Sequence, residues 1–176
     1  MKKGLFLLSL FSLLIFFECA SVRVTTHFDE ATNFSAYQTF HFVRPKRQQG
    51  KGQIKSPLFT KEVFREIKPI LESKGLRETT TKQEADLLVV FYAWIKNQRD
   101  FIRPNYRIGR YGRVWRSRPG RVVHYKEGTL VIDIVDRQKQ ELIWQGIGQG
   151  VLERHNPRQN CIEAVDEILK KYPPQK

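Results

Sequence analysis

Cysteine is scarce in this chain of 176 residues, which contains only Cys19 and Cys161. A disulfide framework, which stabilises many small exported domains, is therefore excluded, and a folded domain must depend on the packing of its core. Histidine is scarce too, and none of the four histidines stands at the spacing of a metal-binding pair. We expect neither a metal nor another cofactor.

Acidic residues are few as well, since 18 Asp and Glu stand against 31 Lys and Arg. The resulting formal net charge of +13 is unevenly distributed. Residues 96–126 contain ten basic side chains and a single acid, Asp100, and residues 44–55 contain five basic side chains and no acid. The basicity therefore belongs to two segments rather than to the whole domain.

No apolar run is long enough to cross a bilayer, which takes about 20 residues of helix. The longest, Leu5–Phe17, has thirteen residues broken only by two serines. Two lysines precede it, and small residues follow from Cys19 onward, a pattern typical of a secretory signal peptide. We predict a signal peptide of the lipoprotein type over residues 1–18 and one mature domain over 19–176.

A cysteine directly after such a run indicates lipid attachment at Cys19, which would tether the mature chain to a membrane without spanning it. Glu18 departs from the small residue that usually precedes a lipid-bearing cysteine. Two alternatives stay open, namely ordinary cleavage after Ser21 and an uncleaved anchor. An unmodified Cys19 would also allow a disulfide with Cys161, which nothing else in the sequence favours.

Apolar patterning predicts both strands and helices. The strand patterns cover residues 22–28, 37–42, 85–95, 129–135 and 142–152. One helix is expected from Ser56 and Pro57 to Gly75, and a second from Pro157 to Tyr172. The last two strands should form an antiparallel hairpin. The expected fold is α+β, an antiparallel β-sheet of about five strands with two helices packed on one face.

Glycines in the last strand share one parity at Gly146, Gly148 and Gly150. One face of that strand therefore lacks side chains, so either a helix lies close to it or the strand bends. The GIGQG motif lies inside a strand pattern instead of opening a helix, which argues against a dinucleotide-binding loop. Trp94 and Trp144 are expected in the core or on a sheet face.

Three stretches together resemble a known family: YKEGTLVIDIVDRQKQELIWQGIGQGVL over Tyr125–Leu152, KGL at Lys74, and ADLLVVFY at Ala85–Tyr92. In this order they are similar to the bacterial lipoprotein family known as domain of unknown function 4136. Its members are envelope lipoproteins with a small α+β domain and no established reaction, cofactor or catalytic residue. The resemblance implies a lipid on Cys19 and an outer-membrane location facing the periplasm.

Residues 103–121, RPNYRIGRYGRVWRSRPGR, depart from that family, in which this connection is rich in glycine and aromatic residues. Guanidinium groups among aromatic rings can contact phosphate or carboxylate and stack on flat groups. In a cytoplasmic protein they would suggest RNA or single-stranded DNA. Behind an export signal the nearer anions are lipid headgroups, lipopolysaccharide phosphates and peptidoglycan carboxylates, so nucleic acid is not expected.

We therefore predict a basic loop over 96–126 that contacts anionic envelope components, although a solvated loop that only aids solubility explains the same charges. The candidate anion-binding residues are Arg103, Arg107, Arg110, Arg113, Arg116, Arg118, Arg121 and Trp115.

No catalytic residue is predicted. Asp133 and Asp136 flank a strand end, where a turn aspartate and an outward-facing polar residue are expected, with paired acid–base carboxylates as the alternative. Ser56 and Ser117 have no histidine at a recognisable offset. The sequence favours a lipid-anchored, non-enzymatic interaction or structural module. The alternatives are a soluble periplasmic protein and an envelope enzyme.

Overall fold

The computed structural model describes residues 22–44, 52–54, 56–103, 105–108, 114–152 and 157–173. Residues 1–18 and Cys19 lie outside the described residues, so the signal-peptide and lipid predictions are not addressed by the fold. Within the six described ranges, no helix is long and apolar enough to cross a membrane.

The described residues form eight strands and two α-helices. The strands are β1 (Val22–Phe28), β2 (Thr39–Phe42), β3 (Arg77–Glu78), β4 (Leu87–Ile102), β5 (Asn105–Ile108), β6 (Val114–Arg118), β7 (Arg121–Asp136) and β8 (Glu141–Val151). The helices are α2 (Pro57–Ser73) and α3 (Pro157–Leu169).

Six strands form one mixed sheet in the order β1-β8-β7-β4-β2-β3. Strands β1, β8, β7 and β4 are antiparallel neighbours, whereas β2 pairs in parallel with both β3 and β4. The predicted α+β class is confirmed, but the wholly antiparallel sheet of about five strands is wrong. The reason is the connection: α2 returns the chain to the end of the sheet where β2 begins, so β3 and β4 run in the direction of β2.

Both helices begin where the sequence indicates, and α2 ends just before Gly75, whereas α3 ends at Leu169 rather than at the predicted Tyr172. The Ser56 hydroxyl accepts a hydrogen bond from the Phe59 N–H of α2 at 3.4 Å, and Pro57 occupies the first turn. Gly75 follows α2 at a φ of 89°, a left-handed conformation that glycine adopts at little cost. The expected position of each helix is confirmed.

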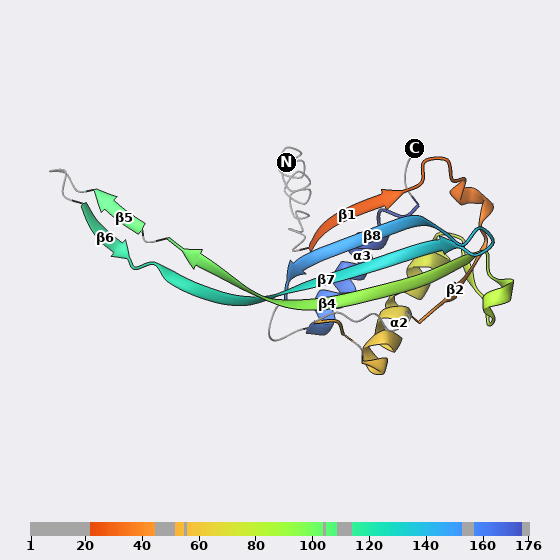
Figure 1. Cartoon of the computed structure of the whole chain (residues 1–176), viewed down its shortest axis with the longest axis horizontal. Helices are drawn as coiled ribbons and strands as arrows, with labels where there is room; N and C mark the ends of the chain where they lie inside the picture. Colours follow the sequence, from red (N-terminus) through yellow and green to blue (C-terminus); the bar gives the residue numbers. More distant parts are fainter. Residues whose placement is uncertain are drawn as a thin grey trace, which may run out of the picture.

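The two helices cover the same face of the sheet, with α2 and α3 packed side by side (Figure 1). The Phe59 ring of α2 contacts Phe91 of β4, with ring centroids 6.2 Å apart. Ile132 of β7 pairs with both Phe91 and Gly146, and Ile168 of α3 lies against Gly146, so all of these groups share one face. The predicted arrangement of two helices on one face is confirmed.

The glycines of β8 bring α3 close to the sheet. A methyl group added at Gly146 would lie 2.4 Å from Cγ2 of Ile168, and one at Gly148 would lie 2.8 Å from its Cδ1. The close helix expected over these positions is therefore present. Trp144 is fully buried beneath α3, with its ring 5.3 Å from that of Tyr172. Trp94 stacks on Tyr92 at 5.8 Å on the opposite sheet face.

Strands β4 and β7 continue well beyond the helices as a two-stranded ribbon (Figure 1). Their pairing is unbroken from Leu87 opposite Asp136 to Ile102 opposite Arg121, and the β5–β6 hairpin lies at the far end. We call the described residues of 96–126 the basic arm. The loop predicted there is wrong, because backbone pairing with a neighbouring strand extends each strand without needing an apolar pattern.

Candidate functional site

The basic arm holds most of the predicted anion-binding residues, although not as one cluster. Arg103 is exposed directly after β4, and Arg121 is exposed at the start of β7. The hairpin places Arg107 opposite Trp115, Tyr106 opposite Arg116, and Asn105 opposite Arg118. Arg110, Arg113 and the lipid-attachment candidate Cys19 lie outside the described residues.

Apolar side chains are exposed on the same arm. Phe101 and Val122 face each other across the ribbon and are 57% and 56% exposed, and Ile102 is 44% exposed. Phe101 lies two residues from Arg99 in β4, which is the spacing of one strand face, and Arg103 follows just after the strand. An exposed apolar group among cations suits the boundary between lipid headgroups and acyl chains.

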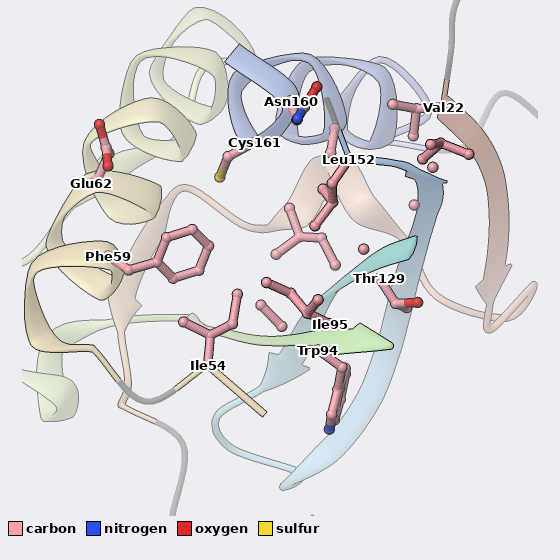
Figure 2. A pocket seen from close by; sticks show the side chains of 17 residues that line it. Val22, Ile54, Phe59, Glu62, Trp94, Ile95, Thr129, Leu152, Asn160 and Cys161 are labelled. Carbon is pink, nitrogen blue, oxygen red and sulfur yellow. The ribbon is translucent and has the colours of Figure 1, made fainter. Parts of the chain in front are cut away.

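An apolar pocket of about 280 Å³ lies at the base of the arm, beneath the two helices. Figure 2 shows Ile54, Phe59, Leu152 and Cys161 pointing toward one space from four parts of the chain. The sheet forms the floor of the pocket, which includes Gly128 of β7. Glu62, Thr129 and Asn160 are the polar residues among its lining.

Ile54 reaches the pocket because residues 52–54 add a short extension to the edge of the sheet. The Ile54 N–H donates to the Ala93 carbonyl at 2.9 Å, and the Ile95 N–H donates to the Gly52 carbonyl at 2.9 Å. Gly52 has a φ of 86°, and a methyl group there would lie 2.4 Å from the Ile95 carbonyl oxygen. Only glycine fits this close approach.

Cys161 lines the pocket and is not suited to act as a nucleophile. Burial, and then the nearby carboxylates of Glu62 and Glu66, raise the pKa of its thiol to about 12. The thiol therefore stays protonated at neutral pH, whereas attack on a substrate requires the thiolate.

The two aspartates that the sequence singled out point to opposite faces of the sheet. Asp136 pairs with Leu87 on the helix-covered face, and Asp133 pairs with Val90 on the open face. They do not form a paired acid–base site. In the described ranges, no group of three or more His, Cys, Asp or Glu side chains is arranged to hold a metal ion.

Asp136 stabilises the turn between β7 and β8, as predicted for one of this pair. Its carboxylate accepts the Gln138 and Lys139 N–H groups at 2.8 and 2.9 Å and the Tyr37 hydroxyl at 2.8 Å. Burial alone would raise the pKa of Asp136, but these hydrogen bonds outweigh it and hold the pKa below its usual value. The role is structural.

Asp133 lies half-buried on the open sheet face and accepts a hydrogen bond from Gln145 Nε2 at 2.8 Å. Burial raises its pKa, and the Gln145 hydrogen bond only partly opposes that effect. Because the folded-state pKa lies above the unfolded value, the stability linked to Asp133 is present below the unfolded pKa and is lost as pH rises through the folded one.

Asp133→Asn is therefore expected to stabilise the fold at pH 7 by up to about 1 kcal/mol, because the amide oxygen still accepts from Gln145 without a buried charge. Chemical denaturation of both chains at neutral pH and again below the unfolded pKa of aspartate measures the difference. The gain should vanish at the acidic pH, where Asp133 is itself neutral. An equal gain at both values would contradict the electrostatic explanation.

Solved structures with similar folds come from several bacteria. A PDZ domain protein from Parabacteroides distasonis matches at a TM-score of 0.57 and 15% identity, covering 89% of this chain and 37% of its own. A PelC dodecamer from Paraburkholderia phytofirmans matches at a TM-score of 0.50 and 10% identity, covering 88% of this chain and 99% of its own. At these identities the likeness shows the fold alone. This chain thus spans little more than a third of the PDZ domain protein.

A third structure, a protein of the domain of unknown function 4136 family from Bacteroides thetaiotaomicron, matches at a TM-score of 0.51 and 16% identity, covering 87% of this chain and 96% of its own. No curated protein matches the chain. Residues 24–174 match the family described as domain of unknown function 4136, which is nearly the whole described domain. The chain therefore belongs to the domain of unknown function 4136 family.

Proposed function

We propose that this chain is a non-enzymatic envelope lipoprotein, held to a membrane by lipid on Cys19, whose basic arm binds anionic envelope material. The observation that carries the proposal is the arm itself, a paired ribbon that extends beyond the core and adds nothing to it (Figure 1). A surface element with so many cations and no role in the core is better explained by binding than by stability.

The chemistry of the arm favours a lipid surface over peptidoglycan. An anionic leaflet attracts each nearby Lys or Arg by about 1 kcal/mol, so several contacts together give firm binding at low salt. Phe101 and Val122 add exposed apolar area that can enter the headgroup layer of a membrane. A carboxylate-bearing glycan has no apolar layer in which these side chains could be buried. Lipopolysaccharide phosphates offer the same combination of anions above acyl chains.

Binding of residues 22–176 to vesicles tests this proposal. We expect binding to phosphatidylcholine vesicles that contain phosphatidylglycerol, weak binding to phosphatidylcholine alone, and loss of the difference as salt rises from about 0.01 M to about 1 M, where the Debye length falls from about 30 to about 3 Å. Equal binding to the two kinds of vesicle at low salt would contradict the proposed role of the arm.

A further inference from the structure

We propose that the pocket at the base of the arm binds the single acyl chain of a free anionic amphiphile, such as a fatty acid, with the anionic head held by Lys126 and Arg99. This inference goes beyond the proposed function. It requires neither a lipid on Cys19 nor attachment of the arm to a surface.

The walls of the pocket suit an acyl chain. Apolar side chains converge on it from the 52–54 extension, α2, the sheet, the end of β8 and α3 (Figure 2). They include Ile54, Phe59, Ala93, Leu130, Leu152 and Ala164. At about 280 Å³, the pocket is just below the roughly 300–1,000 Å³ that small-molecule sites occupy, which fits one chain rather than two.

Glycines in the floor let the walls of the pocket pack directly on the sheet. Gly128 and Gly148 line the pocket with no side chain, on the face where their strand neighbours carry Leu130 and Ile132. A methyl group at Gly128 would lie 2.7 Å from Cδ2 of Leu152, another pocket residue. The glycine therefore lets Leu152 lie directly against the floor, where it forms part of the apolar wall.

Cations stand just outside the pocket on the same face of the sheet. Ile95 and Gly128 form the last cross-strand pair that lines the pocket, and the next pair on that face is Asn97 with Lys126, followed by Arg99 with His124. Successive same-face pairs are roughly 7 Å apart along a strand. Lys126 and Arg99 are both exposed, so a carboxylate or phosphate at the mouth can reach them.

The opposite side of the mouth would repel the same anion. Glu62 of α2 is half-buried and lines the pocket, and its carboxylate lies 3.6 Å from Nη2 of the exposed Arg65. The amphiphile is therefore expected to lie with its head toward the arm rather than toward α2. The charges around the mouth therefore favour one orientation of the amphiphile.

A competing occupant is the lipid of the chain itself. Val22 lines the pocket, and Cys19 precedes it by three residues, a span of roughly 10 Å in an extended chain. A lipid attached to Cys19 carries no anionic head for Lys126 and Arg99 to bind. The charges therefore favour the free amphiphile.

Photo-crosslinking of the full chain in its host membranes tests the proposal, with a diazirine-bearing fatty acid as the probe. After illumination and digestion, we expect the probe on peptides that carry Ile54, Phe59 or Leu152. Cys161→Phe and Ile54→Trp fill the pocket from two walls and should each lower this labelling at least tenfold. The matched control Leu58→Trp adds similar bulk at a position of α2 that is 79% exposed and does not line the pocket, and it should label as the unaltered chain does.

The role of the two cations is tested separately, by substitutions at exposed positions. Lys126→Gln with Arg99→Gln should lower labelling by the fatty-acid probe several-fold and leave labelling by the corresponding uncharged alcohol unchanged. A thermal melt of each variant identifies any chain that has failed to fold. If a pocket-filling variant fails to fold, the substitutions at the exposed Lys126 and Arg99 still test the proposal.

Three outcomes would overturn the inference. They are labelling that both pocket-filling variants leave unchanged in folded protein, labelling that Lys126 and Arg99 do not influence, and labelling that occurs only after Cys19→Ala, which would assign the pocket to the chain's own lipid. None of them depends on vesicle binding, so failure of this inference and failure of the arm's proposed role are distinguishable.

Discussion

Neutralising four basic side chains of the arm is expected to weaken binding to phosphatidylglycerol vesicles by about three orders of magnitude. The variant carries Arg99→Gln, Arg103→Gln, Arg121→Gln and Lys126→Gln, all at exposed positions. Each cation contributes about 1 kcal/mol near an anionic leaflet, and about 1.4 kcal/mol corresponds to a tenfold change in affinity. Vesicle sedimentation at about 0.1 M salt, where the Debye length is about 10 Å, measures the partition coefficient.

A matched control separates the arm from net charge. Lys61→Gln, Arg77→Gln, Lys82→Gln and Lys139→Gln remove the same number of cations from exposed positions elsewhere on the domain. This variant is expected to lose no more than about tenfold, since those charges lie away from the arm and are screened beyond about 10 Å of the surface at moderate salt. Equal losses for the two variants would show that binding follows net charge alone.

Gly146→Val is expected to destabilise the fold by about 3 kcal/mol, the upper end of what overpacking a core costs. A Cβ at this position would lie 2.4 Å from Cγ2 of Ile168 and 2.4 Å from Cη2 of Trp144. Both neighbours are fully buried, so neither can move without shifting α3 from the sheet. Urea denaturation of both chains measures the loss.

Gln149→Val is the control, on the same strand but on the other face and exposed. It adds the same side chain without meeting α3, so the change should stay within about 0.5 kcal/mol. A comparable loss at both positions would mean that β8 resists valine for reasons unrelated to helix packing.

Local signals in the sequence predicted most of the sheet and both helices. Ser56 and Pro57 set the start of α2, and the shared parity of Gly146 and Gly148 indicated that a helix lies close to β8. These signals work because capping and close approach depend on residue types a few positions apart. They contain no information on which strands pair in parallel.

The missed features depend on contacts between distant segments. Strand β3 consists of two exposed residues, Arg77 and Glu78, which are held by backbone pairing with β2. No apolar pattern in the sequence therefore predicts this strand. The same holds for the outer halves of β4 and β7, where the density of basic residues suggested a loop. A ribbon needs only a partner for its backbone hydrogen bonds.

The candidate site was only partly predictable for the same reason. Its cations were evident from composition, and Arg103 and Arg121 indeed lie exposed on the arm. The pocket was not evident, because it joins Ile54, Phe59, Leu152 and Cys161, which come from four separate parts of the chain. No local pattern relates these residues before the fold brings them together.

The central claim is that the protein acts at an envelope membrane, to which a lipid on Cys19 holds it. Mass spectrometry of the amino-terminal peptide from native membranes tests this claim most directly. We predict a mature chain that begins at Cys19 and carries a diacylglyceryl group on the thiol. An unmodified amino terminus at Val22, or a chain that still begins with residues 1–18, would contradict that prediction.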